Sequence, residues 1–250
     1  MNILGRELGK KFEQLYAELD SSGKSIEFMP LSNLTMVSQQ DLRGARHTDP
    51  LNPNKAVIYL DKNLSDEEFE LTAVHELCHE LTRLQGIHLL YRVESIDASL
   101  RPLVLQEAAR LTNCFSHISV CLCMKEHGYE IVDYDRKDLD RIREFISQRK
   151  KIDKSMYAGH AIEYISYLYR QKFDCATINV SKMAELYKEW YPEIIKTAER
   201  LLRQIPEVNI TSAIGCYQAT KALRDAVGNE YSVNLASIIK LRNPDTGQPE

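Results

Sequence analysis

Three kinds of sequence feature are missing from this 250-residue chain, and each absence argues against a class of protein. No apolar run approaches the ~18 residues of a membrane span, so we expect no transmembrane helix. Acidic and basic residues are interspersed, with a net charge of -4 and no basic block that would indicate nucleic acid or a membrane surface. The first twenty residues lack the apolar core and small-residue cleavage site of a signal peptide.

The six cysteines include no Cys-x-x-Cys pair, which is the usual spacing of a zinc or redox motif. Most stand among helical apolar residues, where a free cysteine behaves as a small hydrophobic side chain. Cys121 and Cys123 are too close together and too isolated to suggest a zinc site, so helix packing is favoured for both. Together with the missing secretion signal, this pattern predicts reduced thiols and a cytoplasmic location.

The pattern of apolar residues and turn formers predicts an α+β protein, with a small mostly antiparallel sheet packed on one helix and a predominantly helical second half. The expected elements of the first half are a helix over 4–20, two short strands within 25–37, a polar loop over 39–54, a strand over 56–60, and helices over 66–85 and 103–125. The expected helices of the second half are 135–149, 155–172, 180–204, 211–226 and 232–241. We predict a catalytic domain over 1–150, a helical region over 151–242 that binds substrate or a partner, and a disordered tail over 243–250.

The helix over 66–85 has the clearest boundary signals. Ser65 and Glu68 form a Ser-x-x-Glu capping box, and Leu64 and Phe69 have the spacing of a hydrophobic staple. Gly86 is a suitable C-terminal stop.

This helix carries the string His75-Glu76-Leu-Cys-His79. Histidines four residues apart project from one face of a helix, so both can bind one Zn²⁺ at ~2.0–2.1 Å. Glu76 points beside that face and can act as the general base toward a water molecule that the metal has acidified. The competing interpretation is structural: histidines at the edge of a core face, with Glu76 paired to Arg83 or to solvent.

A catalytic zinc needs a third protein ligand. A third histidine six residues after the second is absent, because Gln85 occupies that position. We predict Glu107 instead, on a following helix where Ala108 and Ala109 permit close approach; a solvated carboxylate is the alternative. The other candidates are Glu94 and Asp97 in the connector, and His88. His117, ten residues beyond Glu107, is expected to be a packed histidine, with support of the ligands as its alternative role.

The order of these features resembles that of the zincin metallopeptidases with a glutamate third ligand. A strand is followed by an acidic helix start, by His-Glu-x-x-His and then by Glu-Ala-Ala on a second helix. The resemblance is closest to the ImmA/IrrE family of intracellular metallopeptidases, over about residues 50–125. It implies zinc bound by His75, His79 and Glu107, with Glu76 as the catalytic glutamate. It also implies a protein substrate such as a transcriptional regulator.

The sequence thus predicts a zinc-dependent metallopeptidase that hydrolyses peptide bonds of a protein substrate. Tyr157 and His160 are weak candidates for stabilising the oxyanion, and helix-start residues without a role are the alternative. If the strand over 56–60 is a sheet edge, it could pair with an extended substrate. Two other functions stay open: a regulatory or sensor module with a structural zinc site, and a zinc hydrolase of a non-peptide amide.

Overall fold

The computed structural model describes residues 1–34, 43–48, 52, 54–87, 89, 91–94, 96–130, 140, 143–144, 154–175, 180–227 and 234–248. The chain forms two compact units. Unit 1 consists of Met1–Leu84 and Val120–Glu130, and unit 2 of Gln85–Ser119 and Ile131–Glu250. Helix α3 (Arg101–Glu126) belongs to both, since unit 1 resumes at Val120 within it. The predicted domain boundary near residue 150 lies outside the described residues.

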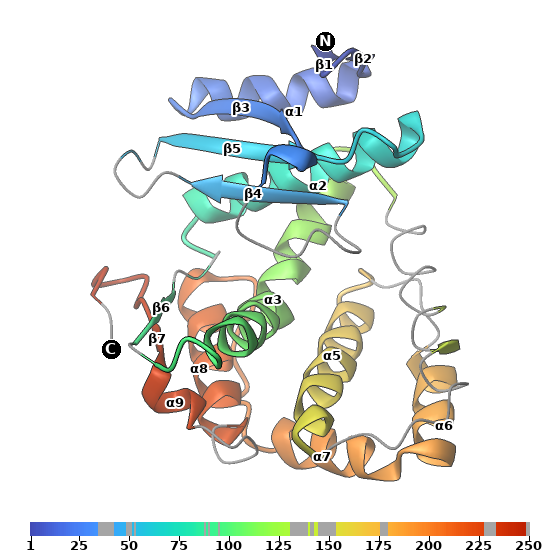
Figure 1. The fold of residues 1–250 in the computed structure, drawn as a ribbon, viewed down its shortest axis with the longest axis vertical. Helices are drawn as coiled ribbons and strands as arrows, with labels where there is room; N and C mark the ends of the chain where they lie inside the picture. Colours follow the sequence, from blue (N-terminus) through green and yellow to red (C-terminus); the bar gives the residue numbers. More distant parts are fainter. Residues whose placement is uncertain are drawn as a thin grey trace. The chain divides into compact units, whose positions relative to one another are not determined.

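Unit 1 contains a three-stranded sheet in the order β3 (Ser25–Pro30), β5 (Lys55–Leu60), β4 (Gly44–Thr48). The β3–β5 pairing is parallel and the β4–β5 pairing antiparallel, as Figure 1 shows. The predicted strand over 56–60 is confirmed. The condition under which this strand could pair with an extended substrate is not met, because β5 pairs on both sides and is not a sheet edge. The edge strands are β3 and β4, and β4 lies within the segment that we predicted as a polar loop.

The sheet packs against α2 (Asp66–Leu84) through β4 and β5, as predicted. Alternate side chains of β5 are buried, and these are Ala56, Ile58 and Leu60. The capping box of α2 is confirmed: the amide of Glu68 donates to Ser65 Oγ and the amide of Ser65 donates to Glu68 Oε2, both at 3.3 Å. Gly86, at φ +75, follows the end of α2 in a conformation that favours glycine.

The N-terminal segment differs from the predicted helix over 4–20. Strands β1 (Asn2–Ile3) and β2 (Arg6–Glu7) form a short antiparallel hairpin, and helix α1 begins only at Lys10 and runs to Ser21. The turn between the strands uses positive φ angles at Leu4 and Gly5, which are incompatible with a helix. A 3₁₀ turn, η1 (Leu31–Asn33), follows β3.

Unit 2 is mainly helical. Its further elements are β6 (Tyr91–Val93), α5 (Lys154–Lys172), α6 (Val180–Trp190), α7 (Pro192–Leu202), α8 (Ala213–Val227), α9 (Leu235–Ile238) and β7 (Ile239–Leu241). Strands β6 and β7 pair antiparallel, and α5 packs against α6 and α7 (Figure 1). Across the described segments, none of the helices has the length and apolar character required to cross a membrane.

Two predicted helices of unit 2 need correction. The helix over 180–204 is divided, because Pro192 has no amide hydrogen to donate and stands at the start of α7. The segment over 232–241 contains the short α9 and then β7, rather than one helix. The predicted helix over 135–149 lies largely outside the described residues. The predicted α+β class is confirmed.

Candidate metal centre

His75 and His79 face each other from successive turns of α2. Their Nε2 atoms are 3.1 Å apart, and the two rings are nearly perpendicular at 84°. At that distance one nitrogen must carry a hydrogen and the other must accept it, because two bare or two protonated nitrogens repel. Two zinc ligands at ~2.0–2.1 Å from one ion lie a similar distance apart, so the pair has the spacing of metal ligands.

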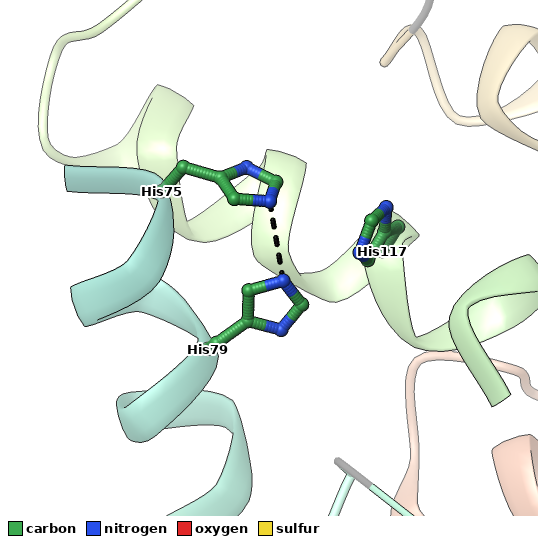
Figure 2. A group of neighbouring side chains, drawn as sticks. All are labelled: His75, His79 and His117. Carbon is green, nitrogen blue, oxygen red and sulfur yellow. Dashed lines mark hydrogen bonds between the residues drawn. The ribbon is translucent and has the colours of Figure 1, made fainter. Parts of the chain in front are cut away.

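His117 on α3 completes a group of three imidazoles. One ring nitrogen from each of His75, His79 and His117 lies within 4.8 Å of the other two, close enough to bind one metal ion. Figure 2 shows the two α2 histidines beside each other, with His117 facing them from α3. His117 stands three residues before Val120, so less than one helical turn of α3 connects it to the part of that helix in unit 1. Among the described residues, this is the group of His, Cys, Asp and Glu side chains with the spacing of a metal site.

Glu76 follows His75 on α2 and is 9% exposed. Burial raises its pKa to about 7; the charge of Arg46 opposes this shift and that of Glu80 adds to it. Gly44 of β4 lies close by. A Cβ atom there would come within 2.6 Å of Thr72 Cγ2 and 3.5 Å of Glu76 Oε1, so only glycine lets β4 approach α2 at this point without displacing a neighbour. Glu76 is therefore a buried carboxylate that can both accept and hold a proton near neutral pH.

Glu80, the residue after His79, is the centre of a cluster of charges. Its carboxylate lies 2.8 Å from Lys24 Nζ, 2.9 Å from Arg46 Nη1 and 3.0 Å from Arg83 Nε. The side chains of Glu80 and Lys24 are both 0% exposed. Because Arg46 belongs to β4 and Glu80 to α2, this ion pair ties the edge strand to the helix that carries Glu76. Arg83 thus pairs with Glu80, whereas the structural interpretation of the sequence paired it with Glu76.

Glu107, the predicted third ligand, lies on α3 in unit 2 and does not belong to the histidine group. It is 2% exposed, and its Oε1 accepts a hydrogen bond from Arg110 at 2.5 Å. The helix rise places its Cα about 15 Å along α3 from that of His117. One ion with ligands at ~2.0–2.2 Å cannot bind both side chains across that distance. Glu107 and His117 are thus mutually exclusive third ligands.

The group does not include the other sequence candidates that the structure describes. Glu94 Oε1 is 3.8 Å from Arg92 Nε, and exposed Asp97 accepts hydrogen bonds from Ser99. His88 lies outside the described residues. Tyr157 and His160 are on α5 in unit 2, where His160 Nδ1 is 3.5 Å from the Tyr187 hydroxyl.

Sequence reasoning considered His117 but did not place it in the metal group, and it did not identify Arg46. The signal for His117 was its position on the helix that also carries Glu107. Arg46 had no usable signal, because β4 was predicted as a loop. Comparisons with models of protein families, with characterised proteins and with solved structures gave no significant match to this chain.

Proposed function

We propose that this chain is a zinc-dependent metallopeptidase that hydrolyses peptide bonds of a protein substrate. The observation that carries the proposal is the group of His75, His79 and His117 with the buried carboxylate of Glu76 next to it in the sequence. Three imidazoles are a known ligand set of catalytic zinc, and they leave a fourth position open for water or substrate.

We assign the third ligand to His117 rather than to Glu107. His117 already lies with the other two imidazoles, whereas the Glu107 carboxylate accepts a hydrogen bond from Arg110. Formation of the site would replace the hydrogen bond between His75 and His79 by two bonds to the ion, and both Nε2 atoms would then be unprotonated. A zinc ion bound there supplies a Lewis acid that polarises water and a substrate carbonyl.

Glu76 supplies the general base. A base works best when its pKa lies near the working pH, and burial brings the pKa of Glu76 to about 7. The positive charge of Arg46 favours the ionised form, which is the form that accepts a proton from water. Glu76 can then return this proton to the amine that leaves when the peptide bond breaks.

The substrate is held, in this proposal, along β4. This strand pairs with β5 on one side, and an extended peptide can add to the other side by main-chain hydrogen bonds. The resemblance to the ImmA/IrrE family suggests an intracellular regulator, such as a repressor, as the substrate.

The proposal is tested by Glu76→Gln, with Glu67→Gln as the matched control. Glu67 is an exposed residue of the same helix, so its substitution changes the charge of α2 and leaves the site alone. Each variant is co-expressed with candidate repressor-type regulators, and cleavage is scored by the appearance of fragments. We expect Glu76→Gln to keep its zinc and to lose ~10²–10⁴-fold or more of the cleavage rate. Glu67→Gln should cleave like the wild type.

The outcome of this test separates an enzyme from a binding module. If a partner is found and Glu76→Gln leaves its processing unchanged, the peptidase assignment fails and the metal site is structural. Hydrolysis of a small amide that depends on Glu76, with no protein cleaved, would support the non-peptide hydrolase instead.

A further inference from the structure

Two buried cysteines face each other inside unit 1, and one of them belongs to α2, the helix that carries His75 and His79. Cys78 belongs to α2 and Cys123 to the C-terminal part of α3, and their Sγ atoms are 2.9 Å apart. A disulfide bond has an S–S distance of ~2.05 Å. The two sulfurs therefore need to approach by less than about 1 Å to form a covalent bond.

The surroundings make the two sulfurs chemically different. Cys78 is 0% exposed and Cys123 is 8% exposed, so a small oxidant can reach only Cys123 directly. When Cys123 is ionised, the Cys78 thiol donates a hydrogen bond to it, and this bond lowers the pKa of Cys123. His127 Nδ1 lies 3.9 Å from Cys123 Sγ, and it adds a polar neighbour on that side. Cys123 has the features of an attacking thiolate and Cys78 those of a resolving thiol.

We propose that Cys78 and Cys123 are a site of reversible oxidation, at which hydrogen peroxide forms a disulfide between α2 and α3. The Cys123 thiolate attacks one peroxide oxygen, the O–O bond breaks, and a sulfenic acid and hydroxide result. Cys78 sulfur then attacks Cys123 sulfur, the S–O bond breaks, and the Cys78 proton leaves with the hydroxyl group as water. The two thiols lose two electrons, and the peroxide is reduced to two water molecules.

The site does not depend on the proposed peptidase activity, because no metal ligand and no catalytic residue takes part. The disulfide would attach α2, which carries His75 and His79, to the C-terminal end of α3 covalently. We therefore expect the oxidised protein to resist unfolding more strongly than the reduced protein and to return to its original state when a dithiol reductant is added.

The test uses the full-length protein, reduced and then treated with hydrogen peroxide. Remaining thiols are blocked, the protein is digested without reductant, and the peptides are identified by mass spectrometry. We expect a cross-linked pair of peptides that contains Cys78 and Cys123, and its loss on treatment with dithiothreitol. Cys78→Ser and Cys123→Ser should each abolish the pair. Cys121→Ser is the matched control, a buried cysteine two residues from Cys123, and should retain it.

Two results would overturn the proposal. The first is wild-type protein in which peroxide consumes thiols without linking these two peptides; this measurement does not depend on whether any variant folds. The second is a Cys123→Ser variant that still forms the link, since another cysteine would then be responsible. A urea midpoint that rises on oxidation of the wild type and of Cys121→Ser, but not of Cys123→Ser, would support it.

Discussion

Replacement of Glu80 by alanine tests the buried charge cluster of unit 1. Glu80→Ala removes the carboxylate that lies 2.8 Å from Lys24 Nζ, while the Lys24 side chain is 0% exposed. An ammonium group that loses its partner in such a place cannot regain full hydration, and breaking a buried pair in this way costs about 3–5 kcal/mol. Since domains are stable by roughly 5–15 kcal/mol, Glu80→Ala should lose a large part of the free energy of unfolding.

The assay is urea unfolding at neutral pH, followed by circular dichroism. The matched control is Glu27→Ala in the same unit, where the pair with Lys55 spans 3.1 Å and the two side chains are 42% and 45% exposed. An exposed pair of this kind contributes about 0–1 kcal/mol. If Glu80→Ala costs no more than Glu27→Ala, the buried-charge argument is refuted.

A second substitution separates the charge from the volume of the side chain. Lys24→Met removes the ammonium group and keeps a long apolar side chain. In the double variant with Glu80→Ala no ammonium stays behind at position 24, so part of the lost stability should return. Simple addition of the two single costs would show that the unbalanced charge is not the cause.

Two further predictions concern the candidate site. His117→Ala should lower the zinc content of the purified protein as strongly as His75→Ala, and Glu107→Ala should leave the content near one ion per chain. The zinc content is measured by elemental analysis. The reverse order would favour the sequence-based assignment of Glu107. Burial raises the pKa of Glu76 from 4.5 to about 7. In chelator-treated protein, the protonated form of Glu76 therefore contributes to the free energy of unfolding. This contribution is complete below pH 4.5 and is lost as the pH rises through about 7. The full loss is about 3 kcal/mol, measured as the difference in urea stability between wild type and Glu76→Gln; a constant difference across this pH range would contradict the shift.

The elements with strong end signals could be predicted from the sequence. The capping box of Ser65 and Glu68 and the stop at Gly86 set the limits of α2, and their hydrogen bonds and backbone angles are present. These signals are local, so they act before tertiary contacts form. The strand β5 was also predictable, because its β-branched and aromatic residues alternate between buried and partly exposed positions.

The elements that depend on a distant partner could not be predicted. Strand β4 (Gly44–Thr48) is Gly-Ala-Arg-His-Thr, which has no apolar alternation, and it is a strand because its backbone pairs with β5. Strand β7 is only three residues long and follows directly after α9, so its apolar pattern predicts a continuation of the helix.

The candidate site likewise has one part that could be predicted from the sequence and one part that could not. The spacing of His75 and His79 along one helix was sufficient to predict that they face each other, and their Nε2 distance of 3.1 Å agrees. The third member of the group was not predicted, because helical periodicity gives the direction of each side chain but not which turn of α3 lies near His79. Glu107 and His117 are both on that 26-residue helix, and only the three-dimensional arrangement distinguishes them.

The division of the chain has a consequence for the order in which it folds during synthesis. Unit 1 takes its residues from two separate stretches, and the second, Val120–Glu130, is translated only after the first stretch of unit 2, Gln85–Ser119. Val120, Cys123 and Met124 are members of the same apolar cluster as Phe12 and Leu77. A nascent chain that ends at Leu84 therefore lacks the apolar side chains that α3 contributes to the core of unit 1. We expect unit 1 to stay incomplete until residue 130 emerges. For the same reason, any single cut between residues 84 and 120 divides unit 1 between the two fragments.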